Sequence, residues 1–168
     1  MRFERVTFSA FADDMRKFEP VKMNAEKLME TWNGIKLPVR STKYSAGYDI
    51  CTPVAVTIPP HSDIKIPSGV KAVFNEDELA TWHLQLFVRS SVGNSGVTIK
   101  HNTGVIDSDY QFGLNDGDMI LALINNSDNL VQYKAGDRIC QGVFLIHGIA
   151  ENDNATGDRV GGMGSTNA

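Results

Sequence analysis

The stretch TWHLQLFVRSS, residues 81–91, carries the alternation that decides the fold. Every second residue from Trp82 to Val88 is apolar, and the intervening positions from His83 to Arg89 are mostly polar. Successive side chains of a β-strand point to opposite faces of the sheet. The stretch therefore predicts a strand with one buried and one polar face, and Arg89 leaves it on the polar face.

Similar short apolar runs recur along the chain, at residues 54–58, 64–66, 119–125 and 138–146. Turn-forming proline, glycine, asparagine or aspartate residues bound these runs. Many short strands at close spacing favour an antiparallel sandwich or barrel. We therefore predict an all-β fold, a jelly-roll-like β-barrel or sandwich.

Helical signal is scarce and is strongest in NAEKLMETWNG, residues 24–34. Asn24 can cap a helix, apolar residues from Ala25 to Trp32 follow the helical period, and Gly34 can end it. This predicts one short helix at about 24–33, and a weaker turn or helix at 76–79. The last segment, residues 151–168, is polar and glycine-rich without a period, so we predict a flexible C-terminal arm after a single β domain over 1–150.

Composition limits the function. The 168 residues fit one domain, and the net charge of −4 provides no broad attraction for nucleic acid or anionic lipid. Cys51 and Cys140 have no metal-ligand spacing, so free thiols in a reducing compartment are expected. The N-terminus is too charged for a signal peptide and no stretch is long and apolar enough to span a membrane. These features predict a cytoplasmic protein with no direct nucleic-acid partner and no membrane partner.

Arg89, Ser90 and Ser91 form the first candidate site, directly after the strand. An arginine fork with neighbouring hydroxyls suits phosphate oxygens. The alternative is a plain transition from strand to turn.

The segment GVIDSDY, residues 104–110, is the second candidate. Asp107 and Asp109 could serve as a general base and a second acidic group, or as outer ligands of Mg²⁺. The alternative is a polar turn. Tyr110 could pack against a sugar or against the core.

Arg138 and Gln141 lie in GDRICQG, and a regular strand would place them on opposite faces. Their convergence requires a β-bulge or a different register, and otherwise they are an edge arginine and a surface amide. In the arm, RVGGMGST offers glycines for close backbone approach, with Arg159, Ser165 and Thr166 for an anionic ligand. The alternative is a disordered terminus.

Five segments in order, SAGYDI (45–50), RSS (89–91), GVIDSDY (104–110), GDRICQG (136–142) and RVGGMGST (159–166), together resemble the motifs of the trimeric dUTPase family, Gram-positive or phage-like members included. The resemblance implies a jelly-roll-like homotrimer with active sites shared between subunits. It implies conversion of dUTP and water to dUMP and pyrophosphate with Mg²⁺.

By the same resemblance, Asp107 is the base that orients the attacking water, and Tyr110 packs on the deoxyribose and excludes a 2′-hydroxyl. The hairpin around Asn102 and Gly104 reads the uracil edge. Asp49 lies near the metal through water or supports the arginines. The resemblance assigns phosphate and ligand contacts to Arg89, Ser90, Ser91, Arg138 and Gln141, and from the arm of a neighbouring subunit to Arg159, Met163, Gly164, Ser165 and Thr166.

The sequence departs from the family pattern in three places. Met163 stands where the family usually has a uracil-stacking phenylalanine, for which Phe112 is a candidate substitute. The segment QFGLNDGD lengthens the turn after Tyr110. The helical segment before Lys36 lies outside the motifs and is a surface decoration, a trimer contact or a docking site for a protein partner.

Two other functions stay open at this point. dCTP deaminase shares the fold but carries a glutamate between two leucines, where this chain has Leu121-Ala122-Leu123. A nucleotide-gated regulator would use dUTP to order the arm and change its affinity for a partner.

Overall fold

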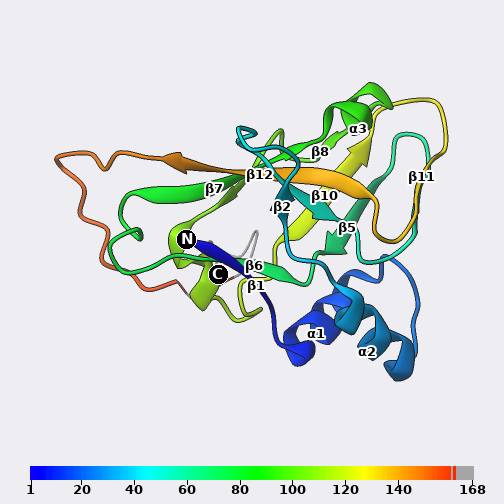
Figure 1. Cartoon of the computed structure of the whole chain (residues 1–168), viewed down its shortest axis with the longest axis horizontal. Helices are drawn as coiled ribbons and strands as arrows, with labels where there is room; N and C mark the ends of the chain where they lie inside the picture. Colours follow the sequence, from blue (N-terminus) through cyan, green and yellow to red (C-terminus); the bar gives the residue numbers. More distant parts are fainter. Residues whose placement is uncertain (160, 162–168) are drawn as a thin grey trace.

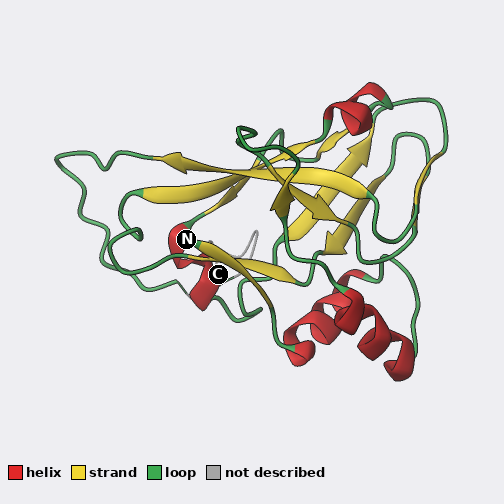
Figure 2. Cartoon of the chain, viewed as in Figure 1, coloured by secondary structure: helices red, strands yellow, loops and turns green. Residues whose placement is uncertain are grey.

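The computed structural model describes residues 1–159 and residue 161. Strands dominate the described chain, and its two longest helices, which come before residue 35, lie next to each other (Figure 2). In chain order the elements are β1 (Arg2–Arg5), α1 (Phe8–Phe18), α2 (Ala25–Gly34), β2 (Val39–Arg40), β3 (Tyr48–Cys51), β4 (Val56–Ile58), β5 (Asp63–Pro67), β6 (Val70–Val73), β7 (Trp82–Val88), α3 (Ser90–Asn94), β8 (Val97–Ile99), β9 (Gly104–Ile106), the 3₁₀-helix η1 (Ser108–Phe112), β10 (Ile120–Asn125), β11 (Val131–Tyr133) and β12 (Arg138–Ile146).

The strands form antiparallel sheets, of which the largest has the order β2-β3-β12-β7-β9. A second sheet has the order β5-β10-β8, and β1-β6 and β4-β11 are two-stranded. The fold is thus mostly β, with the sheets of a β-sandwich and an N-terminal helical segment. No sheet of the described residues closes into a barrel, so of the two predicted forms the structure supports the sandwich.

The strand predicted at 81–91 is β7, which lies beside β12 (Figure 1) and pairs with β9 on its other side. Leu84 and Leu86 are fully buried, whereas Phe87, which lies on the opposite face of the strand, is exposed. Burying a leucine side chain contributes about 1.5–3 kcal/mol. The alternation therefore predicted the strand and its buried face correctly, and the apolar runs at 54–58, 64–66, 119–125 and 138–146 likewise contain β4, β5, β10 and β12.

The predicted helix at 24–33 is α2, with the Asn24 side chain accepting a hydrogen bond from the Lys27 amide at 2.8 Å. Residues 76–81 form a turn, as expected. The single-helix prediction was wrong because α1 precedes α2. Phe8, Phe11 and Met15 follow the helical period, but the charged residues between them mask it.

Helix α1 begins at Thr7, whose hydroxyl accepts from the Ala10 amide, and it packs against α2 and β5 (Figure 1). Phe11 and Met15 are buried in the same core as β5. The helical segment is therefore continuous with the β core. None of the described helices has the length and hydropathy needed to cross a membrane. Both cysteines are free thiols.

Candidate functional site

Arg89, Arg138 and Asp49 make up the first group of predicted site residues, here called the arginine cluster. The Asp49 carboxylate is 7% exposed, and it lies 2.9 Å from Nε of Arg89 and 3.1 Å from Nη1 of Arg138. The Ser41 hydroxyl donates a third hydrogen bond to Asp49 at 2.7 Å. A carboxylate between two guanidinium groups fixes both forks in place.

A β-bulge in β12 brings Gln141 to the same face as this cluster. The pairing of β12 with β3 shifts register between Arg138 and Cys140, and both Ile139 and Cys140 are buried. The extra residue lets Arg138 and Gln141 share one face. Arg138 and Gln141 therefore lie on the same face of the sheet, and a β-bulge places them there.

Gln141 pairs with Asp49 on β3 and with Phe87 on β7, which places it beside Asp49. Its side chain lies so close to Gly47 that a Cβ there would be 2.3 Å from Gln141 Oε1. A side chain at position 47 would therefore have to displace the end of the Gln141 side chain. Ser90 and Ser91 are exposed at the start of α3, immediately after Arg89.

Asp107, Asp109 and Arg159 make up the second group, here called the aspartate cluster. Nη1 of Arg159 donates to Asp107 Oδ2 at 2.7 Å and to Asp109 Oδ1 at 2.9 Å. Burial lowers the pKa of Arg159, but its hydrogen bonds to the two carboxylates outweigh burial and raise that pKa. The two carboxylates bind the same guanidinium. Asp107 is the residue before η1 and Asp109 lies in its first turn, so they are not part of an extended strand.

Asp107 precedes η1 without capping it through its side chain, and its side chain is 54% exposed. Its carboxylate is therefore committed only to Arg159 within the described chain. Asp109 is bound to the same guanidinium.

Tyr110 lies behind the aspartate cluster and is only 1% exposed. The Arg159 guanidinium lies 4.9 Å from the centre of its ring. The Tyr110 hydroxyl donates to the Asp118 backbone carbonyl at 2.8 Å, and burial raises the pKa of Tyr110 to about 12. The ring is thus held from its hydroxyl end and covered by Arg159.

The polar residues behind Tyr110 were missed by sequence reasoning. Asn115 donates to the Tyr110 hydroxyl at 3.1 Å, and Asp14 of α1 accepts from the same amide nitrogen. Asp118 is fully buried and accepts from the Gly69 amide at 2.8 Å. The only signal was the NDGD of the segment after Tyr110, which predicted a longer turn.

Asp118 makes the stability of the fold depend on pH. Burial, and then the nearby Asp14 carboxylate, raise the pKa of Asp118 well above its ordinary value. Its folded-state pKa exceeds the unfolded value, so its stabilising protonation is complete below the unfolded pKa and is lost as pH rises through the folded pKa. Asparagine cannot ionise and keeps a carbonyl acceptor for Gly69. In urea unfolding between pH 4 and 8, we expect Asp118→Asn to gain free energy of unfolding relative to wild type as pH rises. Parallel pH curves for the two proteins would contradict this.

Asn102 lies in the loop between β8 and β9, and Gly104 is the first residue of β9. β8 pairs with β10 and β9 pairs with β7, so the predicted hairpin is instead a loop that passes from one sheet to another. Asn102 is exposed with a φ of 68°, in the left-handed region. Gly104 is buried and pairs with Leu86, whose side chain would lie 3.3 Å from a Cβ at Gly104. The loop between β8 and β9 is therefore exposed at Asn102 and closely packed at Gly104, where β9 begins.

The two clusters do not meet within one chain. Ile106, the residue before Asp107, pairs with Leu84 of β7. Arg89 follows the other end of β7, five positions after Leu84. Because β9 is antiparallel to β7, Asp107 lies one residue further from Arg89. At about 3.4 Å per residue, five positions span about 17 Å, so the backbones that carry the two clusters lie roughly 17–20 Å apart along β7. A single chain holds two separate halves of the predicted site.

Met163, Gly164, Ser165 and Thr166 lie outside the described residues. Phe112, the candidate substitute for the missing aromatic ring, is exposed on η1. The predicted contacts of the arm beyond Arg159 stay predictions.

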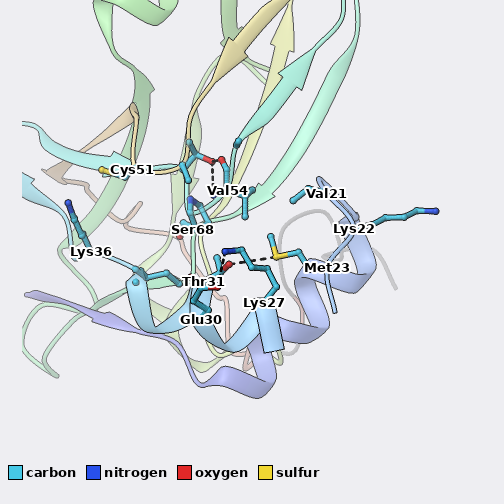
Figure 3. A pocket seen from close by; sticks show the side chains of 17 residues that line it. Val21, Lys22, Met23, Lys27, Glu30, Thr31, Lys36, Cys51, Val54 and Ser68 are labelled. Atoms are coloured by element: carbon cyan, nitrogen blue, oxygen red, sulfur yellow. Dashed lines mark hydrogen bonds and ion pairs between the residues drawn. The ribbon is translucent and has the colours of Figure 1, made fainter. Parts of the chain in front are cut away.

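A cavity of about 600 Å³ lies between α2 and the chain around β3 and β4 (Figure 3). Val21, Met23 and Val54 are among its apolar lining residues, and Lys36 and Cys51 lie at one end. None of the predicted site residues lines it. The cavity is therefore separate from both clusters.

The described residues do not form a Mg²⁺ site by themselves. No group of three or more histidine, cysteine, aspartate or glutamate side chains is placed to hold a metal ion within residues 1–159 and 161. Both Asp49 oxygens are occupied, by Arg89 on one and by Arg138 and Ser41 on the other. Asp49 therefore fits the support of the arginines better than direct metal ligation.

The sequence and fold were compared with known proteins. The family model described as dUTPase matches residues 33–167. The deoxyuridine 5′-triphosphate nucleotidohydrolase of Lactococcus lactis is 37% identical over 139 residues, covering 80% of this chain and 90% of that protein.

Two solved structures are also similar. The crystal structure of the dUTPase from Streptococcus mutans has a TM-score of 0.66 and 28% identity, and the match covers 90% of this chain and 100% of that one. The dUTPase of Staphylococcus bacteriophage 80alpha, a G164S mutant with dUpNHpp, has a TM-score of 0.59 and 22% identity, with 71% and 81% covered, and supports the fold alone. The family match spans both clusters, and the chain belongs to the dUTPase family.

Proposed function

We propose that this chain hydrolyses dUTP to dUMP and pyrophosphate, in a homotrimer whose active sites combine the aspartate cluster of one chain with the arginine cluster of another. The observation that carries the proposal is the separation of the backbones that carry the two clusters by roughly 17–20 Å along β7. One triphosphate cannot reach both within one chain, whereas the base and the phosphate-binding groups must meet around a single α-phosphorus. The resemblance to the trimeric dUTPases implies active sites that are shared between subunits, so that residues of different chains meet around one nucleotide.

In this proposal Asp107 accepts a proton from the water that attacks the α-phosphorus. Its carboxylate is exposed, and its partner in the structure is Arg159 of the arm. Arg159 would have to leave Asp107 when the nucleotide enters. General-base catalysis then requires only that Asp107 orient and deprotonate one water.

The arginine cluster binds the phosphates. Asp49 holds Arg89 and Arg138 as two oriented forks, and Gln141, Ser90 and Ser91 add donors beside them. Positioning and charge neutralisation are the main contributions to phosphoryl transfer. An acidic protein can bind a triphosphate in this way without a basic surface.

Mg²⁺ enters the proposal with the nucleotide. Magnesium is usually held by substrate phosphates with one or two carboxylates and several waters, which suits a chain without a protein cage. When bound it would offset charge on the triphosphate, and Asp49 would approach it only through water.

Tyr110 gives the selectivity for deoxyribose, with its ring uncovered once Arg159 moves away. Asn102 and Gly104 present backbone groups to uracil from the segment that joins β8 to β9. Met163, Gly164, Ser165 and Thr166 close over the ligand from a neighbouring chain. The candidate protein partner of the N-terminal helical segment stays a separate prediction.

A pyrophosphate-release assay tests the proposed function, with dUTP, dCTP, dTTP and UTP, each with and without Mg²⁺. We expect turnover of dUTP alone, and only with Mg²⁺. Ammonia release from dCTP would support the deaminase instead. Equal turnover of UTP and dUTP would contradict the role of Tyr110. Sedimentation should give a trimer, because a stable monomer could not join the two clusters.

A further inference from the structure

Residues 113–118, here called the bridge loop, connect α1 to Tyr110. On the side of α1, the Asp116 carboxylate accepts from the Thr7 backbone amide at 2.7 Å. The Asn115 amide nitrogen donates to Asp14 Oδ2 at 3.2 Å. The bridge loop is therefore attached to α1 at its N-cap and in its second turn.

On the other side, the bridge loop holds the Tyr110 hydroxyl. The Asn115 amide nitrogen lies 3.1 Å from that hydroxyl and 3.0 Å from the Asp118 carbonyl, to which the hydroxyl itself donates. The amide has two hydrogens for three acceptors, so its bonds are shared. Within the described part of the chain, Asn115 is thus the side chain that forms hydrogen bonds with both Asp14 and Tyr110.

This network is buried and its outer end is fixed. Asp14 is 6% exposed, and hydrogen bonds in such surroundings are stronger and more directional than in water. Phe11 and Met15 seat α1 in the core, and the Val6 amide donates to the Gly69 carbonyl at 3.1 Å. A well-anchored helix therefore supports the tyrosine from behind.

We propose that Asp14 and Asn115 are positioning residues that hold the Tyr110 ring where it excludes a 2′-hydroxyl, so that α1 takes part in sugar selection. The inference rests on the proposed function, because the role of Tyr110 toward the sugar belongs there. The family match begins at residue 33, after α1, and so assigns this helix no role. A ring that shifts by a fraction of an ångström would leave room for a ribose.

The test compares kcat/KM for dUTP with kcat/KM for UTP in Asp14→Ala and Asn115→Ala. We expect the dUTP/UTP ratio to fall at least about ten-fold in each, because misplacing a substrate-facing group by about 1 Å has effects of that size or more. Asp14→Asn should restore most of the ratio, since its side-chain carbonyl can still accept from Asn115. Unchanged ratios in both alanine variants would overturn the inference.

Asp116→Asn is the matched control. Asp116 joins the same loop to the same helix but does not touch Tyr110. We expect this variant to lose thermal stability and to keep the dUTP/UTP ratio within about two-fold. A loss of ratio as large as that of Asn115→Ala would overturn the inference, because any loosening of α1 would then have the same effect.

Tyr110→Phe provides a second measurement if an alanine variant at Asp14 fails to fold. It removes the hydroxyl that Asn115 contacts and leaves the ring. In this background Asn115→Ala should change the ratio by no more than about two-fold, as expected for coupled residues. A further ten-fold loss would overturn the inference. A wild-type protein inactive on dUTP would instead refute the proposed function itself, which the variants do not address.

Discussion

Asp107→Asn is expected to lower kcat for dUTP by about 10²–10⁴-fold with little change in KM, the usual size of a general-base contribution. Asparagine keeps the shape of the side chain and can still lie beside a water molecule, but it cannot accept a proton at neutral pH. Single-turnover measurements on a saturating nucleotide would isolate the chemical step. A fall in affinity with unchanged kcat would mean that Asp107 only binds substrate.

Asp109→Asn is the matched control for this effect. Asp109 stands two residues away and shares with Asp107 the guanidinium of Arg159, at 2.9 Å and 2.7 Å respectively. Each substitution removes one negative charge and leaves a neutral carbonyl oxygen that can still accept from that guanidinium. We expect Asp109→Asn to change kcat by less than about ten-fold. Equal losses in both variants would show that holding Arg159, not proton transfer, is the common cause.

The sequence was sufficient to predict those features that follow from local periodicity. Alternation in residues 81–91 predicted β7, and the capping asparagine predicted α2. The sequence also indicated that Arg138 and Gln141 could converge through a bulge or a different register, and β12 has a bulge there. These features depend on neighbouring residues, for which backbone geometry and burial give clear rules.

The relations that a sequence does not contain are those set by long-range packing. Asp14 and Asn115 are separated by 101 positions, and nothing in either local pattern indicates that they touch. Helix α1 was missed because charged residues interrupt its apolar period, and one of them, Asp14, is buried as Phe11 and Met15 are. The distance between the two clusters likewise follows from the register of β7 with β9, which local periodicity does not specify.

The second large effect is expected at Asp49, where a substitution should act on binding rather than on the chemical step. Asp49→Asn keeps the size of the side chain but turns an N–H₂ group toward one of the two guanidinium groups, so that donor faces donor. The fork that loses its partner is no longer oriented for phosphate. Hydrogen bonds to charged groups contribute about 1.5–3 kcal/mol, which corresponds to a rise in KM for dUTP of roughly 10- to 100-fold.

Asp63→Asn separates this effect from the general loss of an ion pair. Asp63 pairs with Lys100 at 2.7 Å, and its carboxylate is 41% exposed, whereas that of Asp49 is 7% exposed. Exposed pairs contribute about 0–1 kcal/mol, so KM should stay within about two-fold. If Asp49→Asn also left KM unchanged, the arginines would be oriented without Asp49, since its carboxylate is the only one among the described residues that pairs with either of them. If kcat fell while KM held, Asp49 would instead act on the transition state, and the water-mediated metal contact would become the better account of its burial between two cations.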